Sequence, residues 1–311
     1  MTITITLFIV LLSAVLTWWM RSLARKKAIL DIPNHRSSHT LPTPRGGGVA
    51  VVTAFFVGIV LLLFQAEIDP RLFNALMIAL IIAATGFWDD LSDLPASLRL
   101  AVQIGCAVAA LYLLSFSGWL WIFALLLIVW FTNLFNFLDG TDGYVVSEVI
   151  FLGIAGWVLY HEMVFLILLA AAIGFLPFNW QKASIFMGDV GSTFLGFVTG
   201  VLLIYYAKDL TQLLIWLTLT LPFWFDATYT LIRRLLNKEK LTQAHRKHLF
   251  QRMVRSGMSH RMTALSLGFM NLFILTAVLL FSDSVMLVFL GTTIVMAAVS
   301  VWVERRVAFD A

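Results

Sequence analysis

The stretch WLWIFALLLIVWFTNLFNF, residues 119–137, is apolar until its last turn and is followed at once by the polar sequence LDGTDG, residues 138–143. Its length matches the ~20 residues that a helix needs to cross the hydrocarbon core of a bilayer. Runs of similar length recur along the chain, at 3–20, 46–64, 71–88, 98–114, 144–160, 163–179, 191–206, 211–232, 262–281 and 284–302. The pattern therefore predicts about 11 transmembrane helices.

The composition supports this interpretation. Hydrophobic residues make up 61% of the 311 residues and charged residues only 12%, and the mean hydropathy is +0.94. A soluble fold of this size could not bury so much apolar surface. No internal repeat or extended linker divides the chain, so we expect one all-α domain, residues 1–311, built as a polytopic integral membrane helical bundle.

Basic residues are distributed unevenly between the two sides of this bundle. When the apolar runs are threaded alternately, all of the 21 Lys and Arg residues except Arg71 and Lys208 lie on one side. Short loops rich in Lys and Arg stay in the cytoplasm, so we expect the N-terminus outside and the C-terminus inside a bacterial inner membrane. The loops expected to form a cytoplasmic active surface are 21–45, 89–97, 138–143, 180–190 and 233–261.

Amides and carboxylates recur every three residues where the first quoted run ends, at Asn133, Asn136, Asp139 and Asp142. On a helix this spacing places the four side chains along one slowly drifting face, which we expect to point at one site. Polar groups at membrane depth usually line a functional cavity. A chance arrangement of loop-capping residues is the alternative.

Carboxylates also stand at two other predicted helix ends on this side. Asp89 and Asp90 are adjacent, and neighbouring like charges raise a pKa or recruit a cation, although a solvated helix end is the alternative. Asp189 lies in FMGDVGS, residues 186–192, where a helix cap is the alternative to a ligand. Oxygen ligands without thiolates favour a hard ion, and Mg²⁺ is usually held by one or two carboxylates plus substrate phosphates. We therefore expect Mg²⁺, with Mn²⁺ as the substitute.

Two basic segments lie on the same predicted side. In PTPRGGG, residues 42–48, three glycines beside Arg45 could offer backbone N–H groups to a phosphate. In HRKH, residues 245–248, the two histidines are expected to be helix neighbours that contact phosphate; a zinc pair lacks a third ligand. Topology alone is the alternative for both segments. Together the motifs predict phosphate handling at a membrane surface, where positioning and charge neutralisation do most of the work.

Five blocks of the chain resemble, in order, the motifs of the polyprenyl-phosphate N-acetylhexosamine-1-phosphate transferases. They are DIPNHRSSHTLPTPRGGG (31–48), GFWDD (86–90), NLFNFLDGTDG (133–143), FNWQKASIFMGDVGS (178–192) and HRKHLFQR (245–252). The HRKH sequence and the eleventh run resemble the branch that initiates O-antigen and common antigen. The peptidoglycan branch of the family carries three consecutive histidines and ten spans.

The resemblance implies a reaction and a set of site residues. An N-acetylaminosugar 1-phosphate, of GlcNAc, FucNAc or a similar sugar, would pass from a UDP-sugar to undecaprenyl phosphate, with release of UMP. Asp89 and Asp90 would be catalytic, Asp89 as the base in a direct attack by the lipid phosphate. Asp189 and Asp142 would bind the metal. The substrates would be bound by Asn133, Asn136, Asp139, Asp142, Asn179, Phe186, Arg45, Arg246 and His248, with Phe186 stacking on uridine and Arg246 and His248 holding the pyrophosphate or sugar.

The expected partners are a UDP-sugar, undecaprenyl phosphate and the lipid bilayer, with a homodimer as a further expectation. Nucleic acid is not expected, because the basic residues are juxtamembrane and are explained by topology and anionic head groups. A secondary transporter is one alternative, but transporters place polar residues near the midplane. A membrane prenyltransferase is the other, and it should show paired, widely spaced Asp-rich motifs. Release of UMP from a UDP-sugar distinguishes the expected reaction from both.

Overall fold

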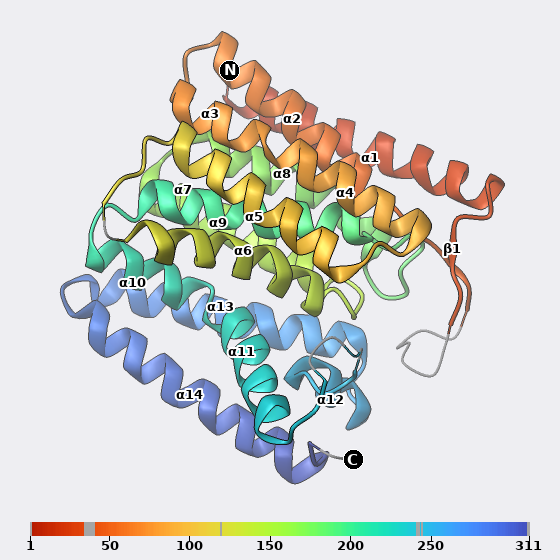
Figure 1. The fold of residues 1–311 in the computed structure, drawn as a ribbon, viewed down its shortest axis with the longest axis vertical. Helices are drawn as coiled ribbons and strands as arrows, with labels where there is room; N and C mark the ends of the chain where they lie inside the picture. Colours follow the sequence, from red (N-terminus) through yellow and green to blue (C-terminus); the bar gives the residue numbers. More distant parts are fainter. Residues whose placement is uncertain (1, 34–40, 119, 241–242, 244, 310–311) are drawn as a thin grey trace.

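A computed structural model of the chain describes residues 2–33, 41–118, 120–240, 243 and 245–309 (Figure 1). Helices account for nearly all of the secondary structure in these residues, as the expected all-α class requires. One short antiparallel pair is added to it, in which strand β1 (Leu30–Asp31) lies against strand β2 (Thr43–Pro44). The segment 34–40 between the two strands lies outside the described residues.

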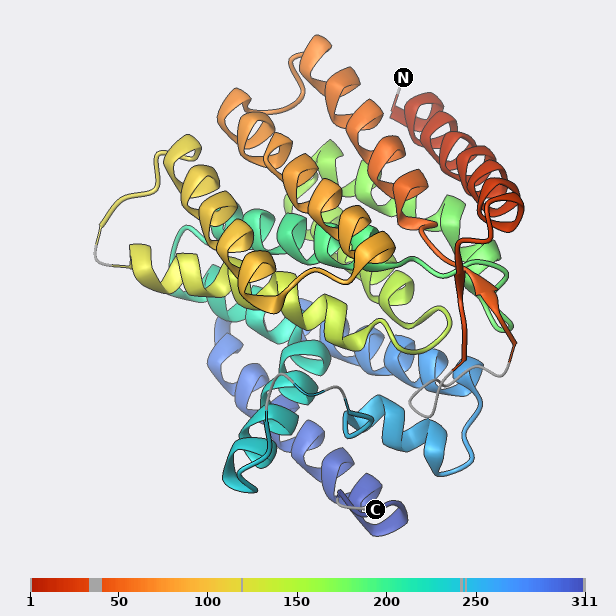
Figure 2. The same cartoon turned by 45° about the vertical axis from the view of Figure 1, so that its right-hand side comes forward.

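The first part of the chain forms one packed group of helices, and the last part lies along one side of it (Figures 1 and 2). The first group comprises α1 (Thr2–Lys26), α2 (Gly48–Phe64), α3 (Pro70–Met77), α4 (Ala79–Ser92), α5 (Ala96–Leu113), α6 (Trp121–Leu138), α7 (Tyr144–Tyr160), α8 (Met163–Asn179) and α9 (Asp189–Tyr206). The second comprises α10 (Leu210–Leu219), α11 (Leu221–Leu236), α12 (Leu249–Arg255), α13 (His260–Leu280), the 3₁₀ turn η1 (Ser282–Ser284) and α14 (Val285–Arg306).

Helix α9 lies at the centre of the bundle and packs against α6, α4 and α2. Almost its whole length is buried. Glycines permit this close packing, since a Cβ at Gly196 would lie 2.3 Å from the carbonyl oxygen of Phe131, and one at Gly200 would lie 3.0 Å from the Cα of Ile128. A side chain at either position would therefore push α6 away from α9.

Each predicted apolar run corresponds to a helix or to a pair of consecutive helices. Within the described residues, seven helical segments are long and apolar enough to cross a membrane, and the pair α10 and α11 makes an eighth. The remaining three, α2, α7 and α8, have 17 residues each. The polytopic helical bundle is thus confirmed, while the number of spans and their orientation stay predictions.

The run 211–232 is not the single straight helix that its sequence suggested. It is bent by 78° where α10 meets α11. Pro222, in the first turn of α11, has no N–H to continue the ladder of α10. Side chains also donate to carbonyls at the bend: Thr220 Oγ1 donates to Trp216 O at 2.8 Å, and Trp224 Nε1 donates to Leu217 O at 2.7 Å.

The loops predicted to share one side of the membrane contact one another. Arg21 Nη1 donates to Ser184 Oγ at 3.4 Å, the N–H of Ala183 donates to Asp142 at 3.2 Å, and the N–H of Arg261 donates to Gln181 Oε1 at 2.8 Å. At the other end of the bundle, Asp69 accepts from Tyr205 and Gln212 accepts from Tyr160. The helices α2, α7 and α8 connect these two ends, as alternating threading requires.

This arrangement predicts the outcome of reporter fusions. Alkaline phosphatase, which is active only after export, should be inactive when it is fused after residue 306 and active when it is inserted between Lys208 and Asp209. The reason is that the first position follows the basic end of the bundle and the second lies at the opposite end. An active C-terminal fusion would mean that the bundle is inverted, and immunoblotting for equal expression is the control.

Candidate active site

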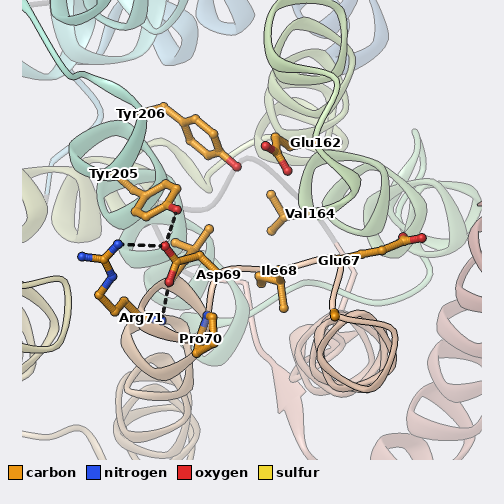
Figure 3. Close-up of a pocket in the computed structure, with 11 residues that line it drawn as sticks. Glu67, Ile68, Asp69, Pro70, Arg71, Glu162, Val164, Tyr205 and Tyr206 are labelled. Carbon is orange, nitrogen blue, oxygen red and sulfur yellow. Dashed lines mark hydrogen bonds and ion pairs between the residues drawn. The ribbon is translucent and has the colours of Figure 1, made fainter.

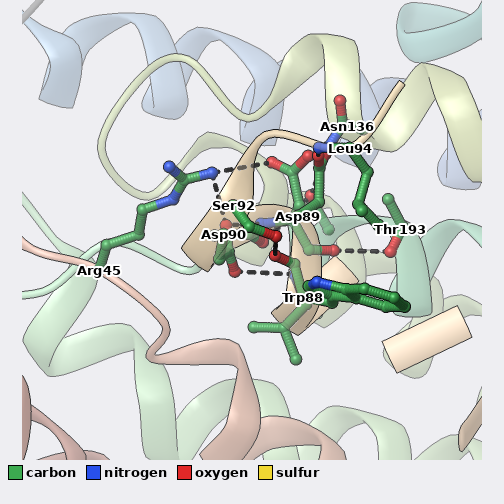
Figure 4. A network of polar contacts seen from close by, with 12 residues as sticks. Arg45, Trp88, Asp89, Asp90, Ser92, Leu94, Asn136 and Thr193 are labelled. Carbon is green, nitrogen blue, oxygen red and sulfur yellow. Dashed lines mark hydrogen bonds and ion pairs between the residues drawn. The ribbon is translucent and has the colours of Figure 1, made fainter. Parts of the chain in front are cut away.

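Three carboxylates converge at the basic end of the bundle, held by two arginines. Figure 4 shows Asp89, Asp90 and Arg45 of this cluster. Asp89 and Asp90 lie in the last turn of α4, and Asp189 is the first residue of α9. Arg45, just after β2, places Nη2 2.6 Å from Asp90 Oδ1 and 3.6 Å from Asp189 Oδ1. Arg99 of α5 places Nη1 2.6 Å from Asp89 Oδ2 and 3.4 Å from Asp189 Oδ2. Asp189 therefore lies between two guanidinium groups.

Asp90 positions the start of α9. Its carboxylate accepts the backbone N–H of Asp189 at 2.9 Å and that of Val190 at 3.1 Å, and its side chain is only 2% exposed. The first N–H groups of a helix have no partner within the helix and favour a negative charge. Gly188 leaves room for this contact, because its φ is +77° and a Cβ there would lie 2.5 Å from Asp90 Oδ2. Asp90 thus fixes Asp189 in place, and a catalytic role for Asp90 stays a prediction.

Both carboxylate oxygens of Asp89 also have partners. Its Oδ1 accepts the N–H of Leu94 at 2.6 Å, and its Oδ2 faces Arg99. Arg99 was counted from the sequence only as a topological charge, and its role in joining Asp89 to Asp189 was missed. The only signal available was its position a few residues beyond the paired aspartates.

The N–H groups of Gly47 and Gly48 are not free to bind a phosphate, which corrects the expectation for these two glycines. The N–H of Gly47 donates to Phe186 O at 2.9 Å, and the N–H of Gly48 donates to Met187 O at 2.8 Å. A Cβ at Gly48 would lie 2.4 Å from the Cα of Gly191. Glycines are needed here because the chain after β2 packs closely against the residues before α9. This contact places Arg45 beside the carboxylates.

The expected single polar face of residues 133–142 is also wrong, because α6 ends at Leu138. Asn133 Nδ2 donates to Gln103 Oε1 of α5 at 2.6 Å, whereas Asn136 Nδ2 donates to Ser192 Oγ of α9 at 3.2 Å. The two amides therefore face different helices. Asn136 lies next to the carboxylate cluster (Figure 4).

The carboxylate of Asp142 contacts other segments of the chain. Its Oδ2 accepts the N–H of Ala183 at 3.2 Å and lies 3.2 Å from His260 Nδ1. Neither of these two contacts joins Asp142 to Asp189. Asn179 has a similar bridging position, since its Oδ1 accepts the N–H of Gly143 at 3.1 Å and its Nδ2 donates to Ile185 O at 3.2 Å. Metal binding by Asp142 and substrate binding by Asn179 stay predictions.

Asp139 follows the last residue of α6, and within the described part of the chain its carboxylate forms neither a hydrogen bond nor an ion pair. Burial and the nearby charges of Asp90 and Asp142 together raise the pKa of Asp139 to about 7, although Arg45 acts in the opposite direction. This region is therefore short of positive charge. An unpaired carboxylate among other carboxylates suits a divalent cation.

The residues present fit Mg²⁺ only in combination with a substrate. Among the described residues, no three His, Cys, Asp or Glu side chains lie close enough together to hold a metal ion by themselves. Mg²⁺ usually keeps several waters and binds through one or two carboxylates and substrate phosphates. Asp189 and Asp139 supply such carboxylates, one next to two arginines and the other without a partner.

The histidines of HRKH are not helix neighbours, because α12 begins only at Leu249. The rings of His245 and His248 nevertheless lie 4.8 Å apart. Burial and the neighbouring His248 and Arg234 lower the pKa of His245 to about 3, so this ring is neutral near pH 7. Its Nδ1 accepts the N–H of Lys247 at 3.2 Å, which leaves Nε2 as a hydrogen-bond donor.

Asp226, in α11, anchors the same loop and was missed from the sequence. It is 1% exposed and accepts the N–H groups of Leu249 at 2.8 Å and Phe250 at 3.1 Å, at the start of α12. Its Oδ1 also lies 3.2 Å from His248 Nδ1, so it fixes the orientation of that ring. An Asp inside a predicted span is itself a signal of function, and this signal could have identified it.

The remaining predicted residues, Arg246 and Phe186, differ in their surroundings. Arg246 is exposed and makes no ion pair or hydrogen bond to the described residues. Phe186 is half-buried, and its backbone pairs with Pro44 and Gly47. The structure therefore leaves Arg246 available at the rim of the site and holds Phe186 beside Arg45.

A groove of about 730 Å³ opens between α5, α6, α11 and the loop before α12. One part of it is apolar and is lined by Leu100, Leu126, Val129, Trp130, Phe137 and Leu231. The other part is polar and is lined by Arg99, Gln103, Asn133, Asn136, Thr193, Gln243, His245, His248 and Gln251. Arg99, Gln103 and Thr193 also line a smaller pocket beside Asp89 and Asp189. The groove thus reaches the carboxylate cluster through Arg99.

Comparison with known proteins places this geometry among enzymes. Residues 72–207 match the family model of glycosyl transferase family 4. The probable undecaprenyl-phosphate N-acetylglucosaminyl 1-phosphate transferase of Bacillus subtilis is 31% identical over 90% of this chain and 86% of its own length. A decaprenyl-phosphate N-acetylglucosaminephosphotransferase of Mycobacterium tuberculosis is 28% identical over 82% and 77%. An undecaprenyl-phosphate alpha-N-acetylglucosaminyl 1-phosphate transferase of Thermotoga maritima is 29% identical over 78% and 80%.

The contacts of Asp226 predict a local loss of structure in the variant Asp226→Asn. The amide has one oxygen where the carboxylate has two, so one backbone N–H of α12 would face an NH₂ group. We expect the free energy of unfolding to fall by about 1–3 kcal/mol and residues 245–255 to exchange hydrogen faster by mass spectrometry. Asp209→Asn is the matched control, because Asp209 caps α10 through Gln212 alone and Asn caps helices as well as Asp. Unchanged exchange in Asp226→Asn would contradict the anchoring role.

Proposed function

Because this chain belongs to glycosyl transferase family 4, as one of its polyprenyl-phosphate N-acetylhexosamine-1-phosphate transferases, we propose that it transfers an N-acetylaminosugar 1-phosphate from a UDP-sugar to undecaprenyl phosphate. The sugar is N-acetylglucosamine or a close relative such as FucNAc. The products are UMP and a lipid-pyrophosphate-linked sugar. The names of the relatives support the lipid carrier and the transferred group.

One observation carries this assignment most directly. Arg99 touches Asp89 and Asp189 and also lines the groove that opens between α5, α6 and α11. A long apolar molecule lying in the groove can therefore bring an anionic end group to the carboxylate cluster. A polyprenyl phosphate has this combination of parts.

The groove explains how the acceptor, undecaprenyl phosphate, would bind. Leu126 is 61% exposed and Leu100 is 46% exposed, so the apolar part of the groove faces the lipid and can receive an isoprenoid chain directly from the bilayer. The phosphate then lies beside Arg99, whose guanidinium can contact a phosphate and a carboxylate together.

The basic loop before α12, together with Arg45, would bind the donor, the UDP-sugar. His245 and His248 line the polar end of the groove, and the exposed Arg246 adjoins them in the chain. Arg246 can present a bidentate fork to the diphosphate. The diphosphate would thus lie between these residues and the carboxylates, with Asn136 at the boundary between the two substrates.

The reaction forms one bond and breaks one bond. An oxygen of the acceptor phosphate attacks the phosphorus that carries the sugar, and the bond from this phosphorus to the oxygen of UMP breaks, so UMP leaves with the electron pair. Asp89 accepts the proton when the acceptor arrives as a monoanion, whose second pKa is about 6. Arg99 must then turn from Asp89 Oδ2 towards the acceptor phosphate. Alignment of the two phosphates supplies most of the rate.

Magnesium is the proposed cofactor, and Asp189 with Asp139 would hold it, with Asp142 as the ligand expected from the motif. When bound, Mg²⁺ neutralises charge on the diphosphate and on the leaving UMP. Two features of the chain's own residues support the proposal, namely the unpaired carboxylate of Asp139 and the excess of carboxylates over arginines in the cluster. Mn²⁺ prefers the same oxygen ligands and is the proposed substitute.

The location and pathway complete the proposal. The chain is a multi-pass membrane protein with several apolar helices, and we place it in the bacterial inner membrane with the carboxylate cluster facing the cytoplasm. Initiation of O-antigen-like polysaccharide is the proposed pathway, on the strength of the HRKH sequence. A homodimer stays a prediction. The transporter and the prenyltransferase are no longer needed as alternatives, because the relatives are sugar-phosphate transferases.

The proposed reaction is tested with the purified protein, undecaprenyl phosphate and a panel of UDP-N-acetylsugars. We expect UMP to appear only when the lipid acceptor is present, in an amount equal to the lipid-linked sugar. Chromatography of the nucleotides and mass spectrometry of the lipid measure both products. Release of UDP would instead show glycosyl transfer without the phosphate and would contradict the proposal.

The metal assignment predicts a loss of Mg²⁺ dependence in Asp189→Asn. We expect turnover to fall roughly 100-fold or more, because a charge aimed at the reacting phosphates is removed, and the residual rate should no longer respond to Mg²⁺ or EDTA. Asp93→Asn is the matched control, since Asp93 is an exposed carboxylate that follows α4 on the same side of the bundle and Asn tolerates its left-handed backbone. Normal turnover of the wild-type protein in EDTA would rule out the metal.

A further inference from the structure

A second pocket, of about 760 Å³, lies at the end of the bundle opposite to the carboxylate cluster (Figure 3). It is formed where α2 ends, α3 and α8 begin, and α9 ends. Asp189 and Tyr206 are the first and last residues of α9, so the pocket is about 27 Å from the active site along this helix. It therefore takes no part in the reaction proposed above.

Tyr206 is the most informative residue in the pocket. It is only 9% exposed, and its ring is fixed by Tyr160 at 4.7 Å, Phe165 at 5.0 Å and Tyr205 at 5.0 Å between centroids. Its hydroxyl nevertheless forms no hydrogen bond with any residue that the structure describes, and it points into the pocket (Figure 3). Buried Tyr hydroxyls usually have a hydrogen-bond partner. A polar group of a ligand that enters the pocket would supply this partner for Tyr206.

The charges around this hydroxyl are mainly negative. Asp69 Oδ2 accepts the hydroxyl of Tyr205 at 3.0 Å and lies 3.3 Å from Arg71 Nη2. Glu162 lies across the pocket, near the hydroxyl of Tyr206 (Figure 3), and forms no ion pair with the described residues. The positive group, Arg71, stands at the rim, where its side chain is 63% exposed. The side of the pocket near Glu162 therefore favours a cation, and the side near Arg71 favours an anion.

The arrangement suits an ammonium group better than a metal ion. No three acidic side chains of the described residues converge closely enough to coordinate a metal. An ammonium group has three N–H donors and can reach acceptors that lie further apart. The phenol oxygen of Tyr206 and the carboxylates of Glu162 and Asp69 are three such acceptors.

We propose that this pocket binds the head group of a zwitterionic phospholipid that carries a primary amine, such as phosphatidylethanolamine. The ammonium lies between Tyr206, Glu162 and Asp69, and the lipid phosphate meets Arg71. The lipid is the favoured source of the amine because the pocket is built from the ends of membrane helices, at the level where head groups lie. Zwitterionic head groups place the two charges a few atoms apart, so one molecule can meet both Glu162 and Arg71.

Native mass spectrometry of the full-length protein in detergent tests the proposal. Phosphatidylethanolamine, phosphatidylcholine and phosphatidylglycerol with identical acyl chains are added in turn, because only the first has N–H donors beside its phosphate. We expect the wild-type protein to retain phosphatidylethanolamine in excess. Tyr206→Phe and Glu162→Gln should each reduce this retention roughly tenfold, as the loss of a hydrogen bond to a charged group predicts.

Matched controls come from the same end of the molecule. Tyr112→Phe removes the hydroxyl of an exposed tyrosine in the last turn of α5, and Asp283→Asn removes an exposed carboxylate in η1. Neither should change lipid retention. Normal UMP release in Tyr206→Phe would show that the variant folds, so a loss of lipid could not be attributed to unfolding.

The following results would support or overturn the binding of an amine-bearing head group. Displacement of the lipid by soluble phosphoethanolamine, and not by phosphocholine, would support recognition of the amine-bearing head group. Equal retention of phosphatidylcholine and phosphatidylethanolamine by the wild-type protein, or full retention by Tyr206→Phe, would overturn the proposal. Displacement by Mg²⁺ without any effect of phosphoethanolamine would make this a metal site and would also overturn it.

Discussion

Two arginines from separate parts of the chain compensate three carboxylates at one end of the bundle, and the position of every reacting group depends on this contact. Arg45 arrives on the segment after β2, and Arg99 arrives on α5. Each guanidinium joins Asp189 to an aspartate of α4. Without them, three negative charges at the end of apolar helices would repel one another. The cluster contains three carboxylates and two guanidinium groups, a composition that suits a cation bound together with an anionic substrate.

Carboxylates also set the positions of helices in this protein. Asp90 accepts the first N–H groups of α9, and Asp226 accepts those of α12. In each case the acid comes from a different helix and is almost fully buried. A helix start that is held in this way cannot move without exposing unpaired donors. Asp189 and His248 are therefore presented by rigid elements, as a site that works by alignment requires.

The same central helix joins the two ends of the molecule. Asp189 begins α9 among the arginines, and Tyr206 ends it in the pocket of the opposite face. Because α9 is buried along its length and packs through glycines against α6, it can hardly bend between the two sites. A head group bound at one face would contact the helix that carries Asp189 at the other.

The sequence by itself determined the membrane class, the helices, and the side on which the polar motifs gather, because these follow from apolar run length and charge. It also indicated Asp89, Asp90 and Asp189, since acids at helix ends are visible as local patterns. Only the tertiary structure decided what each one touches. The pairing of Arg99 with Asp89, the capping by Asp226 and the turn of Asp142 towards His260 depend on contacts between distant segments. Such contacts are set by how the helices pack, and no local spacing encodes them.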